Sequence, residues 1–522
     1  MRFLARRAPS GILAGADSSS GPAVAALLII SLTFYHRLWL PDLVLIKRDA
    51  FRYFLPLKQY IIERLTAGEL PQWLPYEGFG RPFLGASGIG LFHPFTALYF
   101  LLPVPDAYRA ATLVSCVLAG LGAFAIGRAL ELSRAGALLA GVAFALSGYV
   151  VSLTDNLLYL YSICVLPLFC AGLEKALRQS LPWVVAPAVV WATVFLNGDV
   201  QTGYYYGCIA IVWTMARAPG SYQAASVRLA LILGLTALLA GIQLGPAAAA
   251  YAGSERAQPA IFRDQALQWS MHPLRLLTVA ASPVGGDADP VEVSHRFFGS
   301  RPAGEFPVEL WAESLYLGVP VLGLAWLGTR HRRDLRGLAL LGGLALVLAL
   351  GRYGGLYELF FHVVPLWSSF RYPEKLMGVA SLSAALLAGA GLDVLGAAKG
   401  RPPLWFAMGI ACVGAWLVFR SDGISLWIAA AFHAPEALAH AVTDSAALAF
   451  LLSAVASVVV GLILVGVHRG WLGWELAHAL LIVVIVVDLS RVNLGAYHTG
   501  PLEAATFTPG LVEAIRQHAG VL

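Results

Sequence analysis

The chain has 522 residues, of which 58% are hydrophobic and only 12% charged, with a mean hydropathy of +0.73. Soluble domains carry roughly 25% charged residues, so the composition excludes an ordinary soluble protein. The net charge of +5 is modest and its arginines form no basic stripe, which gives no reason to expect a nucleic-acid partner. All five cysteines lie inside apolar segments, which argues against a disulfide framework or a cysteine metal site.

Long apolar runs recur along nearly the whole sequence and predict an all-α polytopic membrane protein. Barrel strands would alternate apolar and polar residues, and runs such as LLIISLTF do not. A spanning helix needs about 20 apolar residues, with roughly 17 tolerable. On this criterion we predict about thirteen spans, near 22–40, 107–127, 135–153, 157–174, 182–197, 202–216, 228–248, 313–329, 336–351, 374–395, 403–419, 443–467 and 471–490.

The run at 89–104 is shorter and contains Pro94, so we interpret it as a re-entrant or interfacial helix. Lys and Arg then collect in the short loops on one side, while the short connections around Asp155 and Asp199 have none. This is the positive-inside pattern, and it predicts a cytoplasmic N-terminus. The first span has no small-residue cleavage site after it and is interpreted as an uncleaved signal anchor.

Residues 41–106 are predicted to form a long outer loop, in which Asp49 stands just outside the first membrane helix at the start of the stretch 47–85. Apolar residues recur at helical spacing from Phe51 to Leu65, which predicts an amphipathic helix lying along the membrane and ending at Gly68. At the head of that helix Asp49 is a candidate general base, although Asp is also a common helix cap. Trp73 and Tyr76 are candidates for stacking on a sugar ring, and an interfacial aromatic belt explains them equally well.

The motif FRYPEK at 370–375 opens the predicted helix 374–395 on the same outer face. Pro373 suits a first helical turn, and Arg371 and Lys375 are four positions apart. Both can therefore face one anion at a helix N-terminus, such as a lipid phosphate. Glu374 works against an anion, and basic residues at a membrane edge often only reach toward headgroups.

Further carboxylates are predicted at outer helix ends. Asp199 lies in the turn NGDVQTGYY and is a candidate for lining a polar pocket, with a plain turn as the alternative. Asp155 has the same two interpretations. Glu313 is predicted at the outer start of a helix, where the dipole favours a carboxylate, and is a candidate substrate or metal contact.

Asp287 and Asp289 form an Asp-x-Asp pair, which is a weak sign of a divalent ion because so short a motif is common in acidic loops. The histidines at 93, 272, 295 and 498 show no metal-ligand spacing, and no phosphate-binding loop or nucleophile elbow is visible. No cofactor is predicted with certainty, and a divalent metal ion stays open.

Several motifs together resemble one known family. The run from Asp49 through GELPQWLPYEGFGRPFLG, then NGDVQTGYY, AESLYLG and FRYPEKLMGVASLSAALLAGAGLD, is similar to the bacterial YfhO-type membrane proteins over roughly residues 30–400. That family resembles the GT-C class of integral membrane glycosyltransferases, which take a sugar from a polyprenyl-phosphate donor on the outer face of the membrane.

The resemblance implies a glycosyltransferase of the bacterial inner membrane, with Asp49 as catalytic base and Arg371 and Lys375 near the donor phosphate. The acceptor would be an envelope glycan, lipid or protein. The expected organisation is a tail at 1–21, a GT-C-like module at 22–400 with outer loops 41–106 and 249–312, extra helices at 401–490 and a short outer tail at 491–522. The alternatives are a transporter or flippase of lipid-linked glycans, although its usual charged residues near the bilayer midplane are missing, and a non-catalytic assembly protein.

Overall fold

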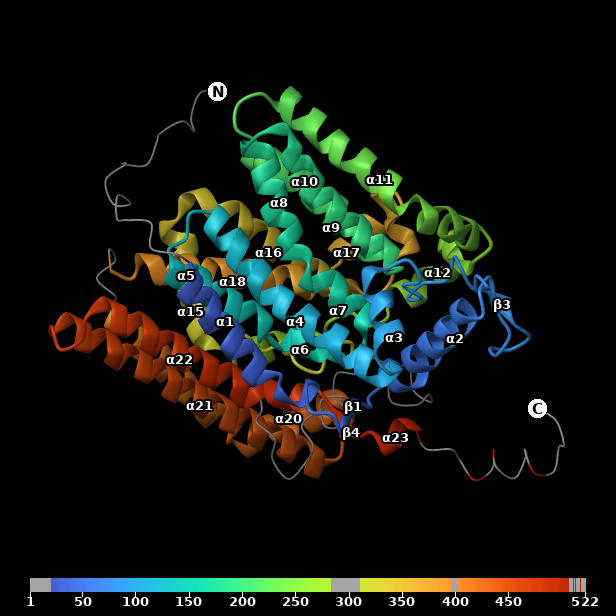
Figure 1. The fold of residues 1–522 in the computed structure, drawn as a ribbon. Helices are drawn as coiled ribbons and strands as arrows, with labels where there is room; N and C mark the ends of the chain where they lie inside the picture. Colours follow the sequence, from blue (N-terminus) through green and yellow to red (C-terminus); the bar gives the residue numbers. More distant parts are fainter. Residues whose placement is uncertain are drawn as a thin grey trace.

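A computed structural model of the protein describes residues 20–282, 310–396 and 401–506, together with 510, 512 and 517. Asp287, Asp289 and His295 lie outside the described residues. The described chain is mostly helix (Figure 1). The helices of its first half are α1 Gly21–Phe34, α2 Leu55–Thr66, α3 Leu98–Leu101, α4 Val104–Ala129, α5 Arg134–Ala145, α6 Gly148–Ser152, α7 Leu157–Cys164, α8 Leu166–Arg178, α9 Val185–Leu196, α10 Val200–Arg217 and α11 Tyr222–Ala252.

The second half continues with further helices and contributes one of the four short strands of the described chain. The helices are α12 Pro259–Ala266, α13 Leu276–Ala280, α15 Val319–His331, α16 Arg336–Ala349, α17 Leu356–Val363, α18 Met377–Val394, α19 Pro402–Phe419, α20 Asp422–Phe432, α21 Glu436–His468, α22 Trp474–Asn493 and α23 Glu503–Thr506. The strands are β1 Leu43–Leu45, β2 Trp73–Leu74, β3 Arg81–Pro82 and β4 Thr499–Pro501, paired antiparallel as β1 with β4 and β2 with β3.

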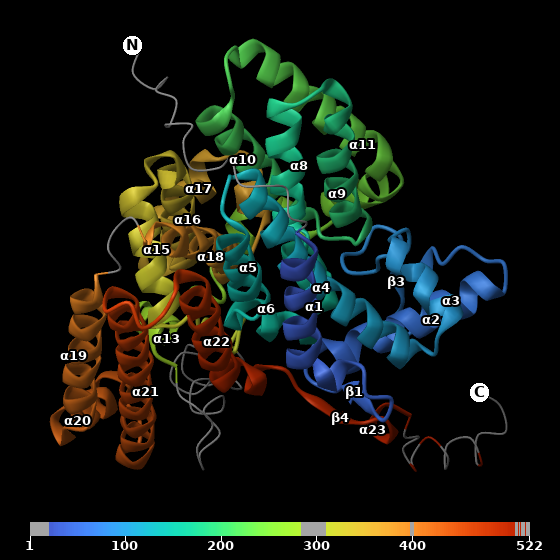
Figure 2. The same cartoon turned by 60° about the vertical axis from the view of Figure 1, so that its left-hand side comes forward.

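A central bundle around α4, α5 and α18 is flanked by three groups of elements. Figures 1 and 2 show α9–α11 on one side, α19–α22 on another, and α2 with the β2–β3 hairpin projecting from a third. Close packing in the centre depends on small residues. A side chain on Gly389 of α18 would collide with the backbone of Gly136 in α5, and one on Gly391 with the backbone of Leu324 in α15. Backbone contact of this kind is typical of helices that pack within membranes.

Several helices begin at a polar residue whose side chain accepts a hydrogen bond from the first turn. This capping satisfies backbone N–H groups that have no partner inside the helix. The caps are Ser133 for α5, Ser147 for α6, Asn156 for α7 and Asp199 for α10. The last two place polar side chains at one end of the bundle, where the candidate site lies.

Each of the predicted spans overlaps one or more helices, and eight helices among the described residues are long and apolar enough to cross a membrane. Shorter apolar helices cover Gly21–Phe34, Leu181–Leu196 and Asp422–Phe432. The total of about thirteen crossings and the location of the N-terminus stay predictions.

The span predicted at 135–153 lies within the candidate membrane span Arg134–Asp155, in which α5 gives way to α6 at Leu146. The structure differs from the sequence prediction in two places. The span predicted at 313–329 becomes helical only at Val319, after Gly318 at φ 85°. Helix α20 was not predicted, because its 11 residues fall short of the length that a spanning helix requires. The run at 89–104 contains helical turns only from Pro94 to Leu101.

The first loop contains the predicted amphipathic helix. A π-helical turn at Ala50–Phe54 leads into α2, which ends before Gly68 at φ 76°. Strand β1 lies just before Asp49 and pairs with β4 in the register Leu43↔Pro501. The beginning and the end of the described chain therefore meet beside the candidate base.

Candidate functional site

Asp49 is exposed at the start of the π-helical turn, and its side chain makes no capping hydrogen bond. Instead, Asp49 Oδ2 accepts a hydrogen bond of 2.9 Å from Asn156 Nδ2. Asn156 also accepts one from the backbone N–H of Tyr159 at 3.4 Å and so caps α7. The capping alternative for Asp49 is therefore not what the structure contains, and the carboxylate is oriented by an amide from a different element.

Two further contacts fix the backbone around Asp49. Arg48 Nη1 lies 3.6 Å from Asp155 Oδ2 and donates a hydrogen bond of 3.0 Å to the carbonyl oxygen of Trp311. Both Arg48 and Asp155 are largely buried, with side chains 10% and 9% exposed. Asp155 is thus the ion-pair partner of Arg48 in addition to lying in a turn.

Arg371 and Lys375 converge on one residue, Gln201 of α10. Gln201 Nε2 donates to the carbonyl oxygen of Arg371 at 2.7 Å, and Lys375 Nζ donates to Gln201 Oε1 at 3.1 Å. The buried ammonium also lies 3.8 Å from the ring centroid of Tyr159 and 5.0 Å from that of Tyr372. Cation–π contacts of this kind retain a cation where water is scarce.

Glu374, predicted to work against an anion, is neutralised by a partner that the motif does not reveal. Its Oε1 lies 2.6 Å from Arg275 Nη1, and both side chains are 3% exposed. The same oxygen accepts from the backbone N–H of Ala312 at 3.2 Å. The carboxylate is committed to this buried pair and therefore forms no ion pair with the basic residues near it in the motif, Arg371 and Lys375.

Arg256, which the sequence analysis missed, joins this basic group from the loop after α11. Burial lowers the pKa of Arg256, and the nearby guanidinium of Arg371 lowers it further, while Asp199 acts in the opposite direction. In the part of the chain that the structure describes, Arg256, Arg371 and Lys375 form no ion pair with a carboxylate. Arg256 stands in the sequence GSERAQP, and nothing in its spacing indicates a site.

Tyr372 marks the point where these charges come together. Burial raises the pKa of Tyr372, Arg371 and Arg256 act against that rise, and Asp49 adds to it. One hydroxyl group therefore experiences the candidate base and both arginines. Tyr372 has a positive φ of 70°, which is uncommon for a residue with a bulky side chain and directs the chain sharply into α18.

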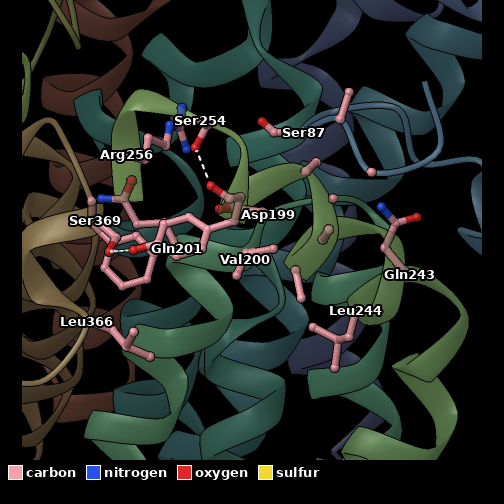
Figure 3. Close-up of a pocket in the computed structure, with 18 of the residues that line it drawn as sticks. Ser87, Asp199, Val200, Gln201, Gln243, Leu244, Ser254, Arg256, Leu366 and Ser369 are labelled. Atoms are coloured by element: carbon pink, nitrogen blue, oxygen red, sulfur yellow. Dashed lines mark hydrogen bonds between the residues drawn. The ribbon is translucent and has the colours of Figure 1, made fainter. Parts of the chain in front are cut away.

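A cavity of about 440 Å³ lies beside this group (Figure 3). Asp199, Gln201 and Arg256 lie toward one end of it, and Gln243 and Leu244 of α11 toward the other. Small and apolar residues of α11 form much of its wall, namely Leu244, Ala247, Ala248 and Ala250. The cavity thus combines a polar end with an apolar side.

Asp199 occupies the polar end of this cavity, as its position in the turn predicts. One oxygen, Oδ1, accepts from the backbone N–H of Thr202 at 3.0 Å and caps α10. The other, Oδ2, is buried without a hydrogen-bond partner. A buried carboxylate oxygen with no partner is costly unless a ligand or water satisfies it.

Glu313, Trp73 and Tyr76 lie elsewhere. Glu313 is not at a helix start, since α15 begins only at Val319, and its carboxylate forms ion pairs with Lys47 and with His498 Nε2 at 2.8 Å. Trp73 and Tyr76 are 51% and 79% exposed in and just after β2. None of the three lines the cavity.

A buried lysine, Lys58, also escaped the sequence analysis, because it lies on the apolar face of α2. Its Nζ donates to the carbonyl oxygen of Ile89 at 2.5 Å. Burial lowers the pKa of Lys58 to about 8, and burial together with Lys58 lowers that of His93 to about 3. Lys58 thereby ties α2 to residues 85–91, part of which lines the cavity.

Within the described ranges, no group of three His, Cys, Asp or Glu side chains is placed to hold a metal ion.

The comparisons with known proteins give one family. Residues 23–277 match a family model described as "Bacterial membrane protein YfhO". No curated protein matches the chain.

Two solved structures are similar to the chain at low identity. The crystal structure of ArnT from Cupriavidus metallidurans bound to undecaprenyl phosphate has 14% identity and a TM-score of 0.49, covering 96% of this chain and 80% of that one. The cryo-EM structure of the arabinofuranosyltransferase AftD from Mycobacteria has 17% identity and a TM-score of 0.37, covering 73% of this chain but only 24% of that one. At these values neither likeness carries a conclusion about chemistry. The family match confirms the predicted resemblance to the bacterial YfhO proteins over residues 23–277 of this membrane protein, and the motifs at 312–318 and 370–393 lie outside the match.

Proposed function

We propose that this protein is a membrane glycosyltransferase, which moves a sugar from a polyprenyl-phosphate donor to an acceptor on the extracytoplasmic face of the bacterial inner membrane. The observation that supports it most is the cavity with Arg256 at its polar end and small apolar side chains of α11 along its side. Arg371 lies close to Arg256, and Lys375 is bound to Gln201, which lines the same end of the cavity. A phosphate attached to a hydrocarbon chain fits this cavity, because the phosphate would lie at the polar end and the hydrocarbon chain along the apolar wall.

Asp199 acts electrostatically on Arg256 and Lys375, but in the described chain none of the three basic residues forms an ion pair with a carboxylate. An anion would therefore be their counter-charge. Arg256 and Arg371 would bind phosphate oxygens through charge-assisted hydrogen bonds, which contribute about 1.5–3 kcal/mol each. Lys375, held by Gln201, adds a third positive charge. These charges would bind the developing phosphate more tightly as the sugar departs, which is the interaction that lowers a barrier.

In the proposed reaction Asp49 takes the proton from an acceptor hydroxyl. The acceptor oxygen forms a bond to the anomeric carbon, the bond from that carbon to the phosphate oxygen breaks, and its electron pair stays on the phosphate. Asn156 would keep Asp49 directed at the acceptor. The configuration at the anomeric carbon is inverted, because a single displacement takes place.

The remaining predicted site residues have subsidiary roles in this proposal. The unpartnered Oδ2 of Asp199 suits a hydroxyl group of the donor sugar. Trp73 and Tyr76, on the exposed hairpin, are placed for contact with an acceptor or the membrane surface and not with the donor. Glu313 would hold Lys47 in place through their ion pair. No step of the proposal requires a divalent metal ion, and the proposal does not decide whether one binds.

The test compares envelope glycans by mass spectrometry in a deletion strain that carries wild-type protein or Asp49→Asn. We expect wild type to restore one defined sugar and Asp49→Asn to restore less than about 1% of it, because a general base contributes about 10²–10⁴-fold in rate. Purified Asp49→Asn should still bind undecaprenyl phosphate. Equal restoration by both proteins would remove Asp49 as base and favour the transport or assembly alternatives.

The same binding assay tests the proposed phosphate site. Arg256→Gln should weaken undecaprenyl phosphate binding about tenfold, corresponding to the loss of one charge-assisted hydrogen bond. Arg263→Gln is the matched control, since Arg263 lies nearby in sequence but pairs with Glu358 at the surface. Equal affinities for Arg256→Gln and wild type would place the phosphate elsewhere.

A further inference from the structure

We propose that the segment from Asp488 to Pro501 is a positioning part of the site, which holds in place the two loops that carry Asp49 and Trp311. The segment lies outside the part of the chain that matches the YfhO family. It comprises the end of α22, a turn and β4. The role of this segment in catalysis rests on the proposed function. Its contacts with the two loops are observed in the structure and do not depend on that function.

The end of α22 binds the loop before α15 through buried polar side chains. Tyr316 Oη donates to Asp488 Oδ2 at 2.8 Å, and Arg491 Nη2 donates to Tyr316 Oη at 2.9 Å. Ser314 Oγ donates to Asn493 Oδ1 at 2.8 Å. Buried polar networks of this kind specify one arrangement, because any displacement leaves further polar groups without partners.

Asn493 extends this network into the central bundle. It is fully buried, and its Nδ2 donates to the carbonyl oxygen of Leu146 at 2.8 Å, where α5 gives way to α6. One side chain thus joins the loop before α15, α22 and the central bundle.

Strand β4 holds the other loop. Gly500 lies opposite Val44, and Leu502 N–H donates to the carbonyl oxygen of Asp42 at 2.9 Å. Just before the strand, Tyr497 Oη donates to the carbonyl oxygen of Phe34 at 3.0 Å, which fixes the approach to β1 from α1. The strand is short but is supported at both ends.

The two loops are also joined to each other through this segment. His498 Nε2 lies 3.1 Å from Lys47 Nζ and 2.8 Å from Glu313 Oε2, and Lys47 and Glu313 form an ion pair. Lys47 stands two positions before Asp49, and Glu313 two positions after Trp311. His498 therefore contacts one residue of each loop.

Trp311 connects the two loops to Lys375 of the basic group. Its carbonyl oxygen accepts from Arg48, and its ring centroid lies 5.0 Å from that of Tyr159 and 5.1 Å from Lys375 Nζ. A shift of the C-terminal segment would therefore move Asp49 and Trp311 relative to Lys375.

Two glycines of the segment offer a matched pair of substitutions. A Cβ on Gly500 would lie 2.6 Å from Ile46 Cδ1 and 3.1 Å from Ile46 Cγ2. The branched side chain of Gly500→Val must therefore displace Ile46, the residue directly after β1, and should loosen the pairing of β4 with β1 although valine itself favours strands. A Cβ on Gly495 would meet nothing within 4 Å, so Gly495→Val is the control. Neither glycine belongs to the proposed catalytic or phosphate-binding residues.

A disulfide can restore the pairing. Pro501, which has no N–H, lies opposite Leu43, and the neighbouring hydrogen bonds at 42–502 and 46–498 place this pair at a non-hydrogen-bonded position. Such pairs have Cα atoms about 4.5 Å apart, within the roughly 4.4–6.8 Å that a disulfide spans. Leu43→Cys with Pro501→Cys, added to Gly500→Val, should therefore lock β4 onto β1.

The experiment measures hydrogen–deuterium exchange of the purified full chain, undecaprenyl phosphate binding and the glycan product in the complemented strain. We expect Gly500→Val to raise exchange about tenfold across 43–54 and 310–318. The product should fall about tenfold or more, since small misplacements are costly in catalysis, while phosphate binding stays within about twofold. Oxidising the cysteine pair should reverse both changes, and a thiol reductant should bring them back.

The proposal is overturned if exchange in these loops is the same for Gly500→Val and Gly495→Val. It is also overturned if wild type makes a glycan product and Gly500→Val, despite its raised exchange, makes the same amount of that product. Should wild type itself make no product, the proposed function has failed, and the exchange data alone then decide whether the segment holds the loops.

Discussion

Asn156 performs two tasks with one side chain. Its Oδ1 caps α7, and its Nδ2 donates to Asp49. The first task concerns stability and the second the direction of the candidate base, so a substitution that keeps one and removes the other can separate them. Serine is such a substitution, because it caps helices well but is too short to reach Asp49.

We expect Asn156→Ser to change the free energy of unfolding by less than about 0.5 kcal/mol and to lower the glycan product about tenfold. Asn156→Ala should lower the product similarly and also cost about 1 kcal/mol in stability, because the cap is lost. Thermal unfolding and the complementation assay measure the two effects. A fully active serine variant would show that Asp49 needs no support from Asn156.

Lys58 gives a pH prediction at the same scale. Its pKa of about 8 lies below the ordinary 10.5 because burial penalises the charged ammonium. Between these pH values the unfolded chain still holds a proton that the folded protein has released, so the free energy of unfolding rises with pH. Over the whole window the rise is about 3 kcal/mol. Thermal unfolding of wild type and Lys58→Met from pH 8 to 10.5 should reveal this rise as a difference between them, and a constant difference would contradict it.

At the scale of elements, helix existence was predictable from apolar runs, and helix boundaries were less so. Length and hydropathy locate the spans because a bilayer imposes both requirements on the local sequence. They cannot locate α20, which is too short, or the extended chain before Val319. The amphipathic α2 and its end at Gly68 were predicted correctly, since periodicity and a glycine are local signals.

The candidate site was predictable only where its chemistry lies in a motif. Asp199, Arg371 and Lys375 lie in recognisable segments, and the structure brings them to one group. Arg256 was missed, and the partner of Glu374 is Arg275, which lies 99 positions away. Contacts over such separations are determined by the tertiary fold, and one sequence carries no local signal for them.

The contact between the first loop and α11 gives a prediction for the cavity. A side chain on Gly85 would collide with the carbonyl oxygen of Pro246 and approach Ala250 Cβ to 2.8 Å. Gly85→Val should therefore separate the loop from α11, at a cost of about 1–3 kcal/mol, and weaken undecaprenyl phosphate binding about tenfold. Gly245→Val, where an added Cβ meets nothing within 4 Å, should leave the affinity within about twofold. Equal losses in both variants would point to a general effect on α11.

At the scale of the whole molecule, a second polar cluster joins helix ends without contacting the candidate site. Glu174 of α8 is almost fully buried and accepts from Arg217 at 2.7 Å and from Trp213 Nε1 at 2.8 Å, both in α10. A buried carboxylate with several donors contributes to the arrangement of α8 and α10, and its loss leaves Arg217 without its counter-charge.

Glu174→Gln should accordingly lower the free energy of unfolding by about 3 kcal/mol while the folded protein binds undecaprenyl phosphate normally. Asp444→Asn is the control, because its pair with Arg420 is exposed and should contribute less than about 0.5 kcal/mol. Thermal unfolding and binding assays check both variants. A loss of binding in Glu174→Gln at temperatures where it stays folded would mean that the two ends of the bundle are coupled.

The pairing of β1 with β4 also bears on biosynthesis. His498 is made 451 positions after Lys47, and at about 5–20 residues per second the ribosome needs roughly 20 to 90 s to cover that distance. For most of that interval β1 has left the ribosome but its edge has no partner strand, which makes it open to wrong pairing. A nascent chain that stalls after α21 would already have most of its apolar helices, yet it would lack the strand that closes the first loop. Insertion into the membrane and completion of the site are therefore separate events in time, and quality control in the cell has a window between them.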